Sequence, residues 1–244
     1  MTLSLHAAAI LFAVALASAV TQGFTGFGFG LMGMAFCTWL LGPQDANVLW
    51  TVLAVLLTTL MWFRLRRHAR TRLAVYLTAG SILGLPVGLW ILANAGEQLL
   101  SRLVGAVVLA FASYSLVNPR FKRRSICAAW ALPAGAAGGM VSGATSMGGP
   151  AAVIFLLILG LDKDETRGTL SCYFTLMIVC KLAMMAGWHG LLRTDHLLWA
   201  ALLAPSALAG LAVGMYAARF FSSETMRKII CAFLLLPGAL LLLR

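Results

Sequence analysis

The chain has 244 residues, of which 61% are hydrophobic and 10% are charged, and its mean hydropathy is +0.95. Soluble domains are nearer half apolar and a quarter charged, so this composition indicates a polytopic membrane protein surrounded by a lipid bilayer. The net charge of +11 comes mostly from basic residues in short loops between apolar runs. That is the positive-inside pattern, and it argues against nucleic acid as a partner.

Eight apolar runs follow one another along the chain, at residues 3–41, 48–63, 73–93, 99–117, 126–160, 168–188, 196–217 and 225–243. Six of them suit one membrane crossing each, because a helix rises about 1.5 Å per residue. The first and fifth runs are too long for one crossing. A glycine-rich stretch interrupts each of these two near its middle, at residues 21–30 and 138–150.

The order of the runs, one long and three single, occurs twice and indicates an internal duplication. Residues match between the halves at a constant offset of 120: Gly23 with Gly143, Thr25 with Thr145, and Gly28 with Gly148. We therefore predict an all-α integral membrane protein with two homologous halves, each a broken first segment followed by three transmembrane helices. The predicted units are a first membrane repeat (1–118), a basic cytoplasmic linker (119–125) and a second membrane repeat (126–244).

The basic residues also bear on how the two long runs cross the membrane. If each long run crosses once, one side holds 11 of the Lys and Arg residues and the other side holds six. If each is a hairpin that returns to its starting side, the distribution becomes 14 and three, with Lys181 left out as intramembrane. The positive-inside rule favours the hairpins, which make the halves inverted repeats, as in many secondary transporters.

The two interruptions carry a distinctive set of polar groups. The first contains Thr21, Gln22 and Thr25, the second contains Ser142, Thr145 and Ser146, and neither contains an acid. Helices that restart at about Leu31 and Ala151 would expose free N–H groups, and Pro150 suits the first position of such a helix. Hydroxyls, glycine backbone and helix N-termini without carboxylates are typical of an anion site.

Glycine spacing offers a second interpretation of the same stretches. Small residues every four positions also mediate close helix packing in membranes, as in Gly26-x3-Gly30. Packing alone accounts for two further glycine pairs, one late in each half: Gly84-x3-Gly88 and Gly210-x3-Gly214. The hydroxyls beside both interruptions favour a site there.

Lys181 is the single lysine well inside an apolar run, and an intramembrane charge is usually functional. It could attract an anion, or its side chain could extend to the interface beside Trp188 and His189. The sequence has no HExxH, GxSxG or Walker A motif and no paired intramembrane carboxylates. We therefore expect neither an enzyme nor a bound cofactor, and no metal site.

Three segments resemble the sulfite exporter TauE/SafE family, also called the toluenesulfonate uptake permeases. They are Gly23-Phe24-Thr25-Gly26-Phe27-Gly28, Ser142-Gly143-Ala144-Thr145-Ser146-Met147-Gly148-Gly149-Pro150, and Arg167-Gly168-Thr169. The first half departs from the second, because Phe29 and Gly30 stand where the second half has Gly149 and Pro150. The resemblance implies secondary transport of a small anion, often sulfite or an organosulfonate, across the bacterial inner membrane.

The predicted mechanism is alternating access, with the anion held between the two interruptions. The candidate substrate-binding residues are Thr21, Gln22, Gly23, Thr25, Gly26, Gly28, Ser142, Gly143, Thr145, Ser146, Gly148, Gly149 and Lys181. An anion channel or a non-transporting membrane assembly protein are the alternatives. The identity of the anion, the direction of transport, a coupling proton or other ion, and the oligomeric state are left open by the sequence.

Overall fold

The computed structural model describes residues 5–117, 127–187, 191–220, 235 and 237–243, and the regular structure within these ranges is helical. The helices are α1 (Leu5–Thr25), α2 (Phe29–Leu41), α3 (Pro43–Leu65), η1 (Arg66–His68), α4 (Thr71–Asn94), α5 (Glu97–Val117), η2 (Ala128–Trp130), α6 (Ala131–Thr145), α7 (Gly149–Leu159), α8 (Lys163–Gly187) and α9 (Thr194–Ala217). This confirms the predicted all-α fold. The whole of the predicted basic linker (119–125) lies outside the described residues, as does part of the last apolar run.

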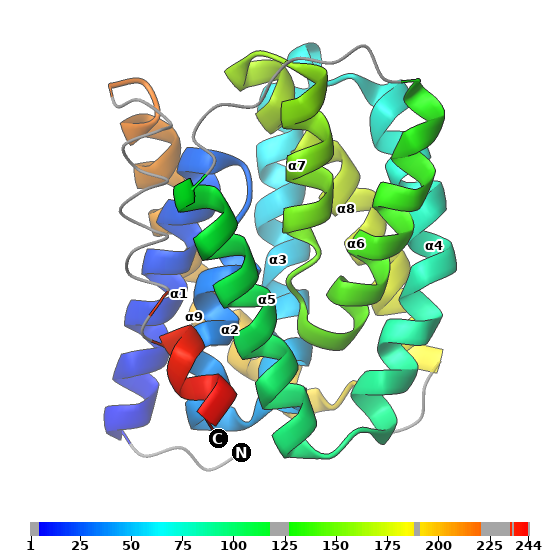
Figure 1. Ribbon diagram of the computed structural model, residues 1–244. Coiled ribbons are helices and arrows are strands. Elements are labelled where there is room, and N and C mark those ends of the chain that lie inside the picture. The colour runs from blue at the N-terminus through cyan, green and yellow to red at the C-terminus, as the bar shows by residue number, and fades with distance from the viewer. Residues whose placement is uncertain (1–4, 118–126, 188–190, 221–234, 236, 244) are drawn as a thin grey trace.

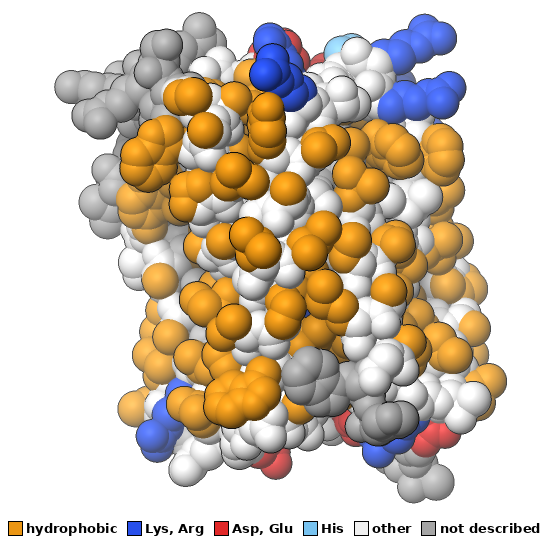
Figure 2. All heavy atoms as spheres, turned by 90° about the vertical axis from the view of Figure 1, so that its right-hand side faces the viewer, with side chains coloured by type: hydrophobic (Ala, Val, Ile, Leu, Met, Phe, Trp, Pro, Cys, Tyr) orange, Lys and Arg blue, Asp and Glu red, His pale blue; other side chains and the backbone are white. Residues whose placement is uncertain are grey.

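Five of the described helices are long and apolar enough to cross a membrane: α1, α3 with η1, α4, α8 and α9. Two other apolar helices, α2 and α7, have only 13 and 11 residues. At about 1.5 Å per residue they are too short to cross a hydrocarbon core of about 30 Å. Hydrophobic side chains cover the middle of the face in Figure 2, and charged side chains lie at its two ends. The chain is therefore a multi-pass membrane protein.

Both long apolar runs are broken where glycine or a left-handed residue interrupts the helix. Between α1 and α2, Gly26 and Gly28 have φ angles of 88° and 102°. Between α6 and α7, Ser146 has a φ of 56°, which is uncommon for a residue with a side chain. Each break is only three residues long, because helix continues through most of the predicted 138–150 interruption, and the new helices begin two residues earlier than expected.

The helices on either side of each break run in opposite directions. In Figure 1, α6 descends to its break and α7 rises beside it, and α1 rises while α2 descends to the start of α3. The first turns of α2 and α7 therefore lie inside the protein rather than at its surface. Such a break is tolerated in a membrane because the surrounding helices bury it.

The first helix of each half packs against a late helix of the other half. The backbone of α4 at Gly84 and Gly88 lies against α6, where an added Cβ would collide with main-chain atoms of Ala136 and Met140. The backbone of α9 at Gly210 and Gly214 lies against α1 in the same way. These contacts confirm that the two spaced glycine pairs serve close packing.

Ion pairs connect segments that are distant in sequence at each end of the bundle. At one end Arg70, which follows η1, pairs with Glu165 of α8 at 2.6 Å. At the other end Asp45 of α3 pairs with Arg193 at 2.5 Å and lies 3.2 Å from His196 of α9. The basic 64–72 segment and the start of α8 thus share one end of the molecule, and the start of α9 lies at the opposite end.

Candidate functional site

The two helix breaks meet in the interior of the protein. Gly30, at the start of α2, lies so close to the carbonyl oxygen of Ser146 that any added Cβ would collide with it. An added Cβ on Gly149 would lie 3.7 Å from the ring of Phe27, which belongs to the first break. Glycine is therefore required at position 30, Gly149 lies at van der Waals distance from the first break, and the two breaks form one shared region with α3 and α8.

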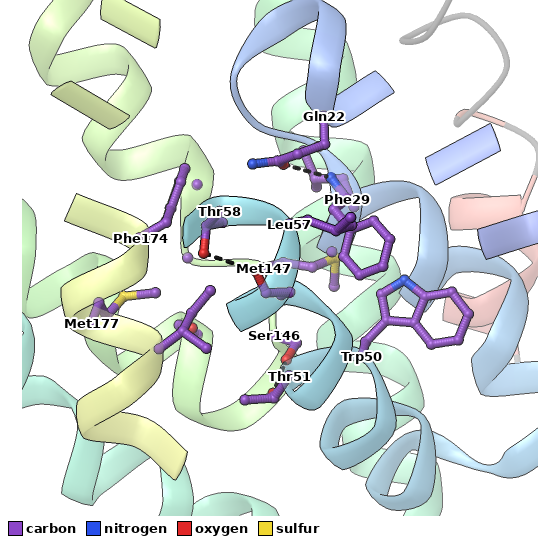
Figure 3. A pocket seen from close by; sticks show the side chains of 18 of the residues that line it. Gln22, Phe29, Trp50, Thr51, Leu57, Thr58, Ser146, Met147, Phe174 and Met177 are labelled. Carbon is purple, nitrogen blue, oxygen red and sulfur yellow. Dashed lines mark hydrogen bonds between the residues drawn. The ribbon is translucent and has the colours of Figure 1, made fainter. Parts of the chain in front are cut away.

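A cavity of about 50 Å³ lies in this shared region. Figure 3 shows Gln22 at one end of it and Ser146 with Thr51 at the other. Phe174 and Met177 of α8 face it from one side, and Phe29 and Trp50 from the opposite side. By the space that buried water needs, the volume holds on the order of three water molecules. The cavity therefore suits a small solute with polar ends and apolar flanks.

The ammonium of Lys181 forms the centre of the polar end. Its side chain is fully buried, and Nζ donates to Asn47 Oδ1 at 2.7 Å, to the Ser142 carbonyl at 2.7 Å and to Ser146 Oγ at 2.8 Å. Three oxygen acceptors match the three N–H donors of a lysine ammonium. The lysine therefore does not extend to the interface.

Hydroxyl and amide groups from α3 complete this polar end. Thr51 Oγ1 lies 2.7 Å from Ser146 Oγ, and Asn47 Nδ2 donates to the Gly143 carbonyl at 3.1 Å. Gly143 belongs to the last turn of α6, whose carbonyls lack helical partners. Asn47 therefore caps α6 and at the same time orients Lys181.

The first break has a matching arrangement with different residues. Gln22 accepts from the Phe29 N–H at 3.2 Å and donates to the Gly26 carbonyl at 3.3 Å, so its amide spans the first break. Arg167 Nη2 donates to the Gly23 carbonyl at 2.6 Å. Gly23 is the offset-120 counterpart of Gly143, and Arg167 stands at that offset from Asn47. The helix before each break is thus capped by a polar side chain from the other half.

The electrostatic balance of the cavity is one-sided. Lys181 lines it, and no Asp or Glu side chain does so among the residues that the structure describes. Within those same ranges no cluster of His, Cys, Asp and Glu could hold a metal ion. The N-terminal turns of α2 and α7 add partial positive charge. A site of this kind can bind an anion, and it offers a cation no charged partner.

The chain matches a known protein family. The model of the sulfite exporter TauE/SafE family matches residues 10–241. This chain belongs to the TauE/SafE family. The match confirms the motif resemblance, and the family is one of membrane transporters of sulfite and related anions rather than of enzymes. No curated protein and no solved structure matches the chain.

About half of the candidate binding residues of this TauE/SafE member line the cavity. They are Gln22, Gly28, Ser142, Ser146, Gly148, Gly149 and Lys181. The other candidates lie outside it: Thr21, Gly23, Thr25, Gly26, Gly143 and Thr145.

The three threonines in this group each donate to a carbonyl one turn earlier in their own helix. Thr145 donates to the Val141 carbonyl at 2.8 Å, Thr25 to the Thr21 carbonyl at 2.8 Å, and Thr21 to the Ala17 carbonyl at 3.0 Å. Thr25 and Thr145 therefore lie outside the cavity with their hydroxyls bonded to main-chain carbonyls, and a role for them as ligands stays a prediction. Gly23 and Gly143 instead supply the carbonyls that Arg167 and Asn47 cap.

Sequence reasoning missed Asn47, Thr51 and Thr58, all on α3. Asn47 and Thr51 are fully buried and contact the second break, and Thr58 lines the cavity wall. Asn47 and Thr51 stand four residues apart, so they share one helix face. That spacing of polar residues at the start of an apolar run was the signal available in the sequence.

Proposed function

We propose that this protein is a secondary transporter of a small oxyanion, sulfite or an organosulfonate, across the bacterial inner membrane. The anion occupies the cavity between the two helix breaks and is neutralised by Lys181. The hydroxyls of Ser146 and Thr51 line one end, and the N-terminal N–H groups of α2 and α7 contribute partial positive charge.

One observation carries this proposal: a fully buried lysine ammonium without a carboxylate beside the cavity. Taking an ammonium out of water costs several kcal/mol, and neutral hydrogen-bond acceptors offset only part of that cost. A bound anion supplies the missing charge. The site is therefore electrostatically incomplete when empty, which favours occupation by an anion over a neutral solute.

The dimensions of the cavity restrict the substrate class. Its volume of about 50 Å³ accommodates a compact oxyanion, with the oxygens at the polar end near Lys181. The stacked rings of Phe29 and Trp50, with centroids 5.6 Å apart, form an apolar flank. A short alkyl group of an organosulfonate would lie against this flank, and larger aromatic sulfonates would require the cavity to expand.

We further propose that the two halves are inverted repeats that alternate around this cavity. Two helices of the first half run opposite to their counterparts: α1 rises and α6 descends, and α3 rises and α8 descends (Figure 1). Inverted halves with broken helices at the membrane midplane are the architecture on which rocking between two access states is built. The α1–α9 pair and the α4–α6 pair, each packed through close glycine contacts, would then move as two units.

The proposal is tested with the full-length protein in proteoliposomes, using a panel of sulfite, sulfoacetate, taurine and sulfate. We expect saturable flux of at least one anion that responds to an imposed proton or second-ion gradient. Flux that never saturates and ignores every gradient would indicate an anion channel. Absence of flux for the whole panel, from protein shown to be folded and inserted, would contradict transport and favour an assembly role.

A further inference from the structure

A second cavity lies between α3 and α9 at the end of the molecule where the basic loops gather. It has a volume of about 790 Å³, far more than a small oxyanion needs. We call it the α3–α9 groove, and its walls come from Leu60 and Arg64 of α3, Leu208 and Met215 of α9, and the start of α8. None of its lining residues belongs to the cavity between the helix breaks.

The rim of the groove is strongly basic. Among the residues that the structure describes, Arg64, Lys163, Arg167 and Arg219 line it, together with His68, against the carboxylate of Asp164. Lys163 Nζ donates to the Ala218 carbonyl at 2.6 Å, which joins the start of α8 to the end of α9. The positive charges therefore gather where two helices from different parts of the chain meet.

Arg167 adds a buried donor to this rim. Its side chain is 8% exposed, Nη2 donates to Gly23, and Nη1 lies 3.5 Å from Asp164. Its buried Nε has no hydrogen-bond partner in the part of the chain that the structure describes. A buried guanidinium N–H without an acceptor is costly, and an anionic group in the groove would remove that cost.

The deeper walls of the groove are apolar. Leu208, Ala212 and Met215 follow one another at spacings of four and three residues, so they share one face of α9. Leu60 of α3 faces the same space and is 40% exposed, and Tyr216 is 62% exposed. Basic groups at the rim and apolar side chains below match a charged headgroup attached to hydrocarbon chains.

We propose that the α3–α9 groove binds one anionic phospholipid. The phosphate lies among Arg64, Arg167 and Arg219, and an acyl chain lies along Leu60 and Met215. Basic pockets between transmembrane helices bind anionic headgroups on the side of the membrane that carries the basic loops. The size of the groove and its apolar walls distinguish a lipid from a free oxyanion, which would use the rim alone.

Native mass spectrometry of the detergent-solubilised full chain tests this with phosphatidylglycerol, phosphatidylcholine and inorganic phosphate as separate probes. We expect one phosphatidylglycerol to bind more tightly than phosphatidylcholine. The double variant Arg64→Gln/Arg219→Gln should weaken it roughly thirtyfold, at about fivefold per basic residue near an anionic headgroup. Arg66→Gln/Arg67→Gln, which removes two exposed charges from the same end but outside the groove, is the matched control.

A second variant separates the lipid from a free anion. Ala212→Trp fills the apolar wall and keeps every charge, so it should reduce phosphatidylglycerol binding. Three results would each overturn the proposal: equal binding of both lipids by the wild type, equal losses in the control and rim variants, or inorganic phosphate binding that displaces phosphatidylglycerol. The wild-type comparison of the two lipids decides the matter even where a variant fails to fold.

Discussion

Replacement of Lys181 by methionine removes the charge at the centre of the candidate site and keeps a side chain of similar length. The three acceptors that lose Nζ each retain another donor in the structure. Asn47 Oδ1 accepts from Ser146 Oγ at 3.1 Å, the Ser142 carbonyl accepts from the Ser146 N–H at 2.9 Å, and Ser146 Oγ stays 2.7 Å from Thr51 Oγ1. We therefore expect the variant to fold.

The expected loss of anion affinity follows from Coulomb's law. Unit charges about 4 Å apart at an effective dielectric constant of about 20 attract by roughly 4 kcal/mol. Charge-assisted hydrogen bonds are worth about 1.5–3 kcal/mol, which gives a lower bound. Lys181→Met should therefore weaken anion binding by about tenfold to a thousandfold.

Two measurements on the purified protein check this prediction. One is kcat/KM for anion flux in proteoliposomes, and the other is the rise in Tm when the anion is added. The wild type should gain stability with anion concentration as a binding ligand requires, and the variant should keep its unliganded Tm but lose that gain. Arg102→Met, which removes an exposed cation that does not line the cavity, should leave both unchanged.

A Lys181→Met protein with a kcat/KM within threefold of the wild type would refute the electrostatic reasoning. A variant that unfolds without anion would show instead that the lysine is structural. Lys181→Arg supplies a further check, because it keeps the charge but cannot place a single nitrogen among the same three oxygens. Its activity should lie between those of the wild type and the methionine variant.

The remaining predictions concern the hydroxyls and the topology. Ser146→Ala should reduce anion affinity roughly tenfold, because Ser146 Oγ contacts Lys181 and lines the cavity, whereas Thr145→Val should cost less than threefold, because its hydroxyl is satisfied by Val141. Equal losses in a transport assay would contradict this assignment. Single cysteines at positions 163 and 193, in a protein without other cysteines, should react with a membrane-impermeant thiol reagent from opposite sides, 163 from the cytoplasmic side. Labelling of position 163 from the periplasmic side and of position 193 from the cytoplasmic side would exclude the hairpin topology.

The sequence was sufficient to locate both helix breaks, because glycine and a proline are costly inside a helix and stand out in an apolar run. It also identified Lys181, since an intramembrane charge is rare. The direction in which the Lys181 side chain points could not be predicted from the sequence. Whether a lysine near a helix end reaches the interface or the interior depends on which face of α8 the other helices cover, and that is a property of the assembled bundle.

The sequence likewise could not show which of the hydroxyls faces Lys181. Thr145 and Ser146 are adjacent, yet only Ser146 adopts a left-handed φ, which turns its Oγ away from the helix and towards Lys181. Threonine within a helix tends to donate to a carbonyl one turn earlier, as Thr145 does. The role of Asn47 could not be predicted for a related reason. It caps a helix at a residue 96 positions away in sequence, and no local pattern reveals such a partner.

The central claim is that an anion binds between the two helix breaks beside Lys181. Selenite is a close analogue of sulfite, and selenium can be located by anomalous X-ray scattering. In crystals of a preparation whose sulfite flux is inhibited by selenite, we predict one strong selenium peak in the cavity, within hydrogen-bond reach of the polar end formed by Lys181 and Ser146. A selenium peak elsewhere with this cavity empty, at a selenite concentration that saturates inhibition, would contradict the account.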